Sequence, residues 1–242
     1  MTRSVVTIHD HVFSSAVRHH WSVRDRQLAE QRQRGASDQG SRAQVTGGKQ
    51  MDGFIETLVD LMSEAGVPGE FLHRTSRTLP GFYRATKDWD LLVVREGRLV
   101  AAVEAKAQVG PSFGNNLNNR VEEAVGSAED LWRAFQEGCL GLVRPWLGYL
   151  FLLEDCPRSR EPVASREPHF PVMPEFRGAS YAQRYEVLCQ RLVLERKYDA
   201  ACLMLSDRKQ WRSRQNYTEP NRNLGARQFI TSLLGHVAPP VQ

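Results

Sequence analysis

Apolar residues recur at helical spacing in five segments of the chain, which predicts five helices. They are expected over residues 11–34, 51–65, 119–135, 181–196 and 225–236. Four further apolar runs predict strands over residues 89–94, 98–107, 148–153 and 198–205. Because helices and strands alternate, with no internal repeat and no visible boundary, we expect one domain of the α/β or α+β class over residues 1–242.

Three stretches lack this periodicity. Residues 35–50 are polar and glycine-rich, so we expect a connector that completes an N-terminal helical segment over residues 1–50. Residues 108–119 (QVGPSFGNNLNN) predict a loop, and Asn119 together with Glu122 is expected to form a capping box at the start of the third helix. Residues 154–180 contain five prolines and predict a long irregular excursion.

Between the first two predicted strands stand Glu96 and Gly97, a pair that favours a tight hairpin turn. Side chains alternate along a strand, so one face of the second strand is expected to carry Val100, Ala102, Glu104 and Lys106, and the other Leu99, Ala101, Val103 and Ala105. Two ionisable residues therefore interrupt a row that otherwise reads as buried. Burying them without partners is costly, which implies a metal ion or a charged partner.

Composition narrows the class of protein only moderately. With 41% hydrophobic and 25% charged residues the chain reads as globular, which excludes a disordered tail or a collagen-like rod. The formal net charge of +4 is small, but it is unevenly distributed. Residues 1–50 hold eight Lys or Arg against four acids, and residues 206–227 hold six against two, so both ends are basic and the middle is acidic. This distribution suits a protein that holds a polyanion over a metal site. Two charged surfaces that simply face solvent explain it equally well.

The cysteines and the N-terminus point to the cytoplasm. Cys139, Cys156, Cys189 and Cys202 have neither CxxC spacing nor histidines at zinc-ligand spacing, so we expect reduced thiols. The N-terminus has no apolar signal-peptide region, and the longest apolar run is too short to cross a bilayer. We therefore expect a cytoplasmic protein without a membrane partner.

Asp90, Glu104 and Lys106 are the candidate chemical centre. The hairpin brings Asp90 opposite the Glu-x-Lys pattern, and two carboxylates a few ångströms apart suit Mg²⁺, with the backbone carbonyl of Ala105 as a further ligand. Lys106 can hold an attacking water or stabilise a pentavalent phosphorus. As a bare pattern this spacing is weak, and a structural Glu104–Lys106 surface pair is the alternative.

Longer motifs around these residues resemble a known family. The Trp-Asp and Glu-Ala-Lys elements at 89–90 and 104–106 are similar to the core of the PD-(D/E)XK nuclease superfamily. More narrowly, LPGFYRATKDWDLLVV, GRLVAAVEAKAQVGPSFGNNLNNRVEEAVGSAEDLW and VTGGKQMDGF resemble XhoI-type type II restriction endonucleases, over about residues 38–155 and much of the remainder. The resemblance implies a mixed central sheet flanked by helices.

The resemblance also implies an activity and a set of roles. It implies Mg²⁺-dependent double-strand cleavage of a palindromic DNA site, with CTCGAG as the expected target. Asp90, Glu104 and Lys106 take the positions of the motif's catalytic residues, while Trp89 stands where the superfamily often has proline. An acid on a preceding helix is also common, and Glu56 is the candidate for it, with Asp60 close behind. A palindrome implies a homodimer, and a restriction enzyme implies a companion methyltransferase that protects the same site.

Several polar residues are candidates for DNA contact. Those that follow the catalytic hairpin are Asn115, Asn116, Asn118, Asn119 and Arg120, which could read bases, or could simply form turns and cap a helix. Those near the C-terminal basic stretch are Arg208, Lys209, Arg212 and Arg214, which suit phosphates and are interleaved with Trp211 and Tyr217. Arg74, Arg77, Arg84 and Lys87 form another basic approach to Asp90.

Two other functions fit the same residues. A structure-specific repair nuclease of the superfamily would share the catalytic centre and read DNA shape instead of sequence. A sequence-specific DNA-binding protein without catalysis would use the basic ends alone, but it gives no reason for the three residues of the centre to occur together.

Overall fold

The computed structural model describes residues 6–34 and 42–238, and it is built around a five-stranded mixed sheet. The strand order is β1-β4-β5-β6-β7, in which β1, β4 and β5 pair antiparallel and β5, β6 and β7 pair parallel. The strands span Leu72–His73 (β1), Leu91–Arg95 (β4), Arg98–Gln108 (β5), Trp146–Glu154 (β6) and Ala200–Ser206 (β7). A separate antiparallel ribbon pairs β2 (Thr78–Pro80) with β3 (Thr86–Asp88). The predicted mixed sheet and its four principal strands are confirmed.

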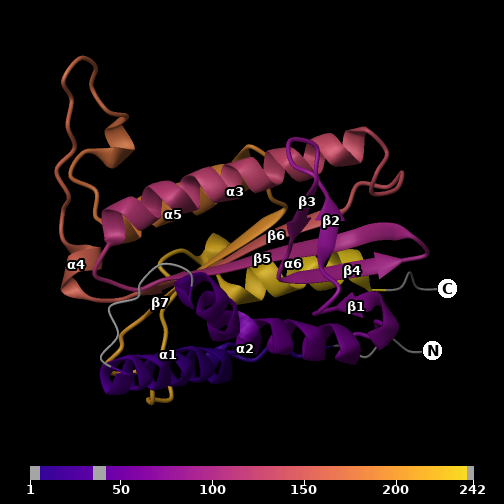
Figure 1. Cartoon of the computed structure of the whole chain (residues 1–242), viewed down its shortest axis with the longest axis horizontal. Coiled ribbons are helices and arrows are strands. Elements are labelled where there is room, and N and C mark those ends of the chain that lie inside the picture. The colour runs from indigo at the N-terminus through magenta and orange to yellow at the C-terminus, as the bar shows by residue number, and fades with distance from the viewer. Residues whose placement is uncertain (1–5, 35–41, 239–242) are drawn as a thin grey trace.

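Helices cover both faces of the sheet (Figure 1). One face packs against α1 (Ser14–Arg34), α2 (Arg42–Glu64) and α6 (Ala226–Val237), and the other against α3 (Phe113–Gln136) and α5 (Tyr181–Leu194). Helix α3 connects β5 to β6, and α5 connects β6 to β7, as parallel strands require. Among the described residues, no helix combines the length and the apolar character needed to cross a membrane. The predicted α/β class is confirmed.

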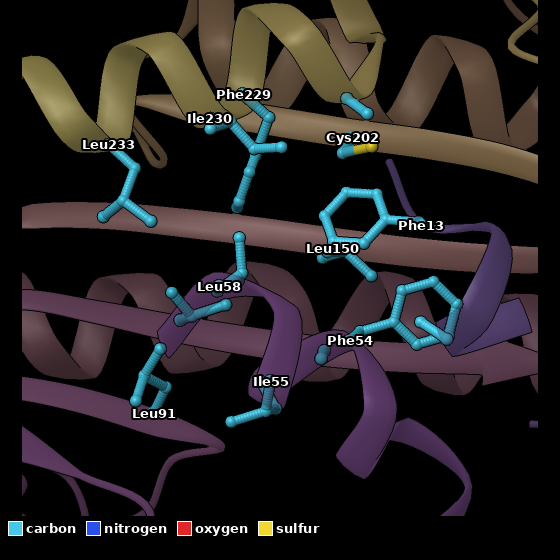
Figure 2. Packing of buried hydrophobic residues seen from close by; sticks show 14 of the residues in the cluster. Phe13, Phe54, Ile55, Leu58, Leu91, Leu150, Cys202, Phe229, Ile230 and Leu233 are labelled. Carbon is cyan, nitrogen blue, oxygen red and sulfur yellow. The ribbon is translucent and has the colours of Figure 1, made fainter. Parts of the chain in front are cut away.

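Strand β6 shows how the sequence produces two cores. Eight of its nine residues are buried, because neighbouring strands flank it and helices cover both of its faces. Leu150 and Leu152 join the cluster formed with α1, α2 and α6, whereas Leu147 and Phe151 join the cluster formed with α3 and α5. Figure 2 shows the first cluster, where Phe54 and Leu58 from α2 and Phe229 from α6 gather around Leu150. The unbroken apolar run at 148–153 therefore predicts an internal strand correctly.

The hairpin of β4 and β5 has the predicted turn and one irregularity that changes its faces. Glu96 and Gly97 both have positive φ values, 52° and 71°, as a two-residue hairpin loop requires. Val94 pairs with Leu99 but Val93 pairs with Ala101, so Val100 is an extra residue on β5. Leu99 consequently lies on the face of Ala102 and Glu104, and Val100 packs with the opposite cluster, so the predicted faces of these two residues are wrong. The alternation from Ala101 onward is as predicted.

Two of the predicted irregular stretches are partly helical. Residues 42–50 belong to α2, so the connector prediction is wrong for them, and residues 35–41 lie outside the described part of the chain. The Gln50 side chain donates to Gln27 of α1 at 2.8 Å, a contact that supports helix despite the two glycines nearby. Helix α3 begins at Phe113, because buried Phe113 and Leu117 anchor its first turns. The capping box of Asn119 is therefore also wrong.

The proline-rich stretch is the irregular excursion that the sequence predicts. Within residues 154–180 the regular structure consists of the end of β6, the four-residue helix α4 (Pro157–Arg160) and a turn of 3₁₀ helix at Pro174–Phe176. The segment extends away from the sheet beyond the end of α3 (Figure 1).

Gly148 on β6 is predicted to be intolerant of a side chain. A Cβ atom there would lie 2.4 Å from the Trp146 ring and 2.8 Å from the Phe229 ring, both buried. Gly148→Ala should lower the free energy of unfolding by about 1–3 kcal/mol through overpacking, as measured by denaturant titration. Gly126→Ala on α3 is the matched control, because no atom lies within 4 Å of its Cβ position. It should raise stability by up to about 1 kcal/mol, and equal effects of the two variants would contradict this packing.

Candidate active site

A cavity of about 600 Å³ opens over the C-terminal half of β5. Its walls come from four parts of the chain: the middle of α2, the β2–β3 ribbon, the β4–β5 hairpin and the middle of α3. The lining residues are Gln50, Met51, Arg84, Lys87, Asp90, Glu104, Ala105, Lys106, Ala107, Asn119, Arg120, Glu123 and Ser127. The three residues of the predicted centre are all among them.

Asp90 is fixed immediately before β4. Its backbone N–H donates to the carbonyl of Val103 at 3.1 Å, which continues the hairpin pairing by one residue. Its Oδ2 accepts the backbone N–H of Ala105 at 2.8 Å, and the Arg77 guanidinium lies 3.7 Å from its Oδ1. The carboxylate is thus held at the edge of β5, beside the Glu-Ala-Lys segment.

Glu104 is buried between two lysines. Its side chain is 4% exposed; Lys106 forms an ion pair with Oε1, and Lys87 Nζ lies 2.8 Å from Oε2. Lys106 Nζ also lies 3.7 Å from Asp90 Oδ2, so it bridges the two carboxylates. The pairing of Lys87 with Glu104 is not predicted from the sequence, which indicates only a basic approach. The signal available was that Lys87 stands three residues before Asp90.

The charges of these groups depend on one another. Burial raises the pKa of Asp90, and the nearby Glu104 carboxylate adds to this shift. Burial alone would also raise the pKa of Glu104, but Lys106 and Lys87 together hold that pKa below its ordinary value. Burial opposes the charge on Lys106 as well, yet Glu104 and Asp90 keep the pKa of Lys106 above its ordinary value. Glu104 and Lys106 are therefore both ionised near neutral pH.

The edge of β5 next to Asp90 supplies oxygen atoms that can act as metal ligands. The N–H and C=O of one strand residue point to the same edge, so the Ala105 carbonyl is directed toward the side where its N–H meets Asp90. Among the described residues, no three His, Cys, Asp or Glu side chains come together as metal ligands. Two carboxylates and one carbonyl form a partial set of hard oxygen ligands, of the kind that Mg²⁺ completes with water and phosphate oxygens.

The asparagines after the hairpin lie on α3 and not in a loop. Asn119 and Arg120 line the cavity, and Arg120 forms an ion pair with Glu123 on the next turn. Asn115 and Asn118 are exposed and Asn116 is half-buried, and none of these three lines the cavity. The structure therefore brings two of these five candidates to the centre.

Two of the four C-terminal basic candidates lie at a second cavity of about 500 Å³. It opens at the carboxyl ends of β6 and β7 and shares no lining residue with the first. Arg208 and Lys209 line it, and Arg208 Nη2 lies 2.8 Å from Asp25 Oδ1 on α1. Arg212 stacks over the Trp211 ring at 4.1 Å, and Arg214 is exposed. Trp211 and Tyr217 are core residues, not exposed aromatics interleaved with the basic side chains.

The structure does not bring Glu56 to the cavity. Both Glu56 and Asp60 are exposed on α2, whereas the α2 residues at the cavity are Gln50 and Met51. Five residues separate Met51 from Glu56, which places the two side chains about 140° apart around the helix. Glu56 and Asp60 therefore face away from Asp90, because the apolar side of α2 packs against the sheet.

Comparisons with known proteins agree with the geometry. The sequence profile of the family "Restriction endonuclease XhoI" matches residues 30–218. The chain is 54% identical over 214 residues to the type II restriction enzyme BstVI of Geobacillus stearothermophilus, covering 86% of this chain and 95% of that protein. It is 47% identical to the type II restriction enzyme XhoI of Xanthomonas vasicola over 77% of this chain and 76% of that one, and 48% identical to AbrI of Azospirillum brasilense over 62% and 68%. No solved structure matches.

Proposed function

Because the chain belongs to the XhoI family of type II restriction endonucleases, we propose that it cuts both strands of DNA at CTCGAG in a Mg²⁺-dependent reaction. As a member it is a site-specific deoxyribonuclease. The observation that carries the proposal is the convergence of Asp90, Glu104 and Lys106 in one cavity. The two alternatives, a repair nuclease and a binding protein without catalysis, have no observation in their favour.

The residues of the cavity suit a divalent cation. Asp90, Glu104 and the Ala105 carbonyl are the proposed ligands, and bound Mg²⁺ would lower the pKa of a water and neutralise charge on the phosphate. Each oxygen of Glu104 is paired with a lysine, so one of these pairs must open for Glu104 to act as a ligand. Lys87 is the lysine that fits this exchange, because it comes from the separate β2–β3 ribbon.

Lys106 has the position of a group that acts on the reacting phosphate. Its ammonium lies between the two carboxylates and lines the cavity. From there it holds the attacking water and stabilises the negative charge of the pentavalent phosphorus. The water gives a proton to solvent as its oxygen bonds to phosphorus, the bond from phosphorus to the leaving deoxyribose oxygen breaks, and that oxygen takes up a proton from solvent. Asp90 and Glu104 supply the negative charge that a cation needs, while the basic side chains that line the same cavity suit the phosphate.

The residues proposed for DNA contact fall into two groups. Asn119 and Arg120 are at the cavity, and Asn115, Asn116 and Asn118 extend the same region of α3 toward its start. Arg208 and Lys209 line the second cavity, Arg212 and Arg214 follow them on the exposed surface, and all four suit phosphates along the duplex. A palindromic target further implies a twofold homodimer, and protection of the host's own sites implies a companion methyltransferase.

A pair of matched plasmids tests the target. One carries a single CTCGAG, and the other carries the same site with one of its two central base pairs changed. In Mg²⁺ the first should give one linear product with ends inside CTCGAG, and the second should stay uncut, since one wrong base pair costs about 1–3 kcal/mol in binding alone. Cuts at a different sequence would show that CTCGAG is not the target, while the assignment as a site-specific endonuclease would stand. Cuts that follow DNA structure would favour the repair nuclease.

A further inference from the structure

The tip of the β2–β3 ribbon, residues Gly81–Arg84, is fastened to α3 by one carboxylate. Asp130 Oδ1 accepts the backbone N–H groups of Phe82 and Tyr83 at 2.8 and 2.7 Å. Asp130 Oδ2 lies 2.9 Å from the Arg84 guanidinium. The Asp130 side chain is only 2% exposed, so it is committed to these three contacts. Together they fix the backbone of the tip in one conformation.

Gly81 shows how closely the tip is fitted. A Cβ atom at this position would lie 2.6 Å from Asp130 Oδ2 and 2.6 Å from the Arg84 carbonyl oxygen. Neither atom has room to retreat, because both take part in the fastened tip. Burying a carboxylate also costs free energy of desolvation, which these contacts must offset. This desolvation cost is met in order to hold the tip in one conformation. That conformation therefore matters for contacts that the tip makes outside the ribbon.

The fastened tip exposes two aromatic side chains next in sequence to Arg84, which lines the catalytic cavity. Phe82 is 45% exposed and Tyr83 is 67% exposed, with their rings edge to face at 4.9 Å. The backbone N–H groups of both residues donate to Asp130, so it is their side chains that remain available for contacts with another molecule. Arg84 and Lys87 of the same ribbon line the cavity, and Ser127, one turn before Asp130 on α3, lines it too.

We infer that this tip is a DNA-contacting element, in which Phe82 and Tyr83 pack on the sugars and base edges of the duplex beside the scissile phosphate. The inference rests on the proposed function, since it assumes that DNA occupies the cavity. Charge complementarity favours DNA as the occupant, because four basic side chains line the cavity against three acidic ones. Exposed aromatics at the edge of a charged cleft are typical of a surface that a partner covers, and rings of this kind stack on or wedge between bases.

Tyr83→Ala tests the contact directly. The readout is the affinity for a 20-base-pair CTCGAG duplex in EDTA, where cleavage does not interfere. We expect the dissociation constant to rise about tenfold relative to the unaltered protein. Phe170→Ala is the matched control, because Phe170 is 83% exposed on the proline-rich excursion and lines neither cavity. An affinity unchanged by Tyr83→Ala, or an equal loss in Phe170→Ala, would overturn the inference.

Asp130→Asn tests the fastening separately. The amide nitrogen would face the Arg84 guanidinium in place of an oxygen, so the tip should loosen. Hydrogen exchange at the amides of Phe82 and Tyr83 should accelerate, and DNA affinity should fall in the same direction as for Tyr83→Ala. Faster exchange with unchanged affinity would overturn the inference. It would leave the proposed function intact, which fails only if the unaltered protein neither binds nor cuts the duplex.

Discussion

Glu104→Gln is expected to lower the rate of DNA cleavage by about 10³-fold or more while leaving affinity for the duplex within about threefold. Glutamine keeps the size of the side chain but removes the anionic oxygens that are the proposed metal ligands. It also leaves Lys106 and Lys87 without their shared partner. DNA affinity should survive, because the residues proposed for DNA contact do not include Glu104. Single-turnover cleavage and equilibrium binding, measured on the same duplex, separate the two effects.

Glu64→Gln is the matched control for this substitution. Glu64 is exposed at the end of α2 and lines neither cavity, so its rate should equal that of the unaltered protein. The same assay decides the role of Glu56, which we expect to be dispensable because its side chain faces away from Asp90. A Glu104→Gln protein that cuts at the normal rate would remove Glu104 from the mechanism.

Lys106→Met is expected to weaken both catalysis and the fold. Cleavage should fall by about 10²-fold or more, because one charge that stabilises the phosphate is lost. Without metal, the free energy of unfolding should fall by about 1–3 kcal/mol, since two largely buried carboxylates lose the ammonium between them. This value is set below that of a fully buried pair because the Lys106 side chain is 25% exposed.

Mg²⁺ should restore part of the stability of Lys106→Met, because a cation bound between the carboxylates replaces the missing positive charge. Denaturant titration with and without Mg²⁺ measures this recovery. Lys197→Met is the control, since Lys197 lies 3.8 Å from Glu129 in a partly exposed pair whose loss should cost less than about 1 kcal/mol. An equal loss of stability in both variants would contradict the bridging role of Lys106.

The β4–β5 hairpin could be predicted because local sequence determines it. The apolar runs, the Glu96–Gly97 turn and the position of Glu104 in an apolar row all act within twenty residues. The extra residue at Val100 could not be predicted, because inserting one small apolar residue among others leaves the pattern readable in either register. The same holds for the start of α3, where asparagines and glycine favour a loop locally but burial of Phe113 and Leu117 favours helix.

The rest of the site depends on contacts between distant parts of the chain. Lys87 reaches Glu104 only because the ribbon folds back over β5, and Asp130 meets Phe82 across 48 residues. Helix α2 brings Gln50 to the cavity and turns Glu56 away, a choice set by which face of the helix is apolar. Such pairings carry no short-range signal, so the sequence predicts the three central residues but not the groups that hold them.

The most direct test of the catalytic centre is a single digestion experiment with and without metal. A plasmid that carries one CTCGAG is incubated with the unaltered protein in Mg²⁺, with the same protein in EDTA, and with Glu104→Gln in Mg²⁺. Linear product in the first reaction alone is the expected result, because cleavage then requires both the cation and its proposed carboxylate ligand. Linear product in EDTA, or from the Glu104→Gln protein at an undiminished rate, would contradict it.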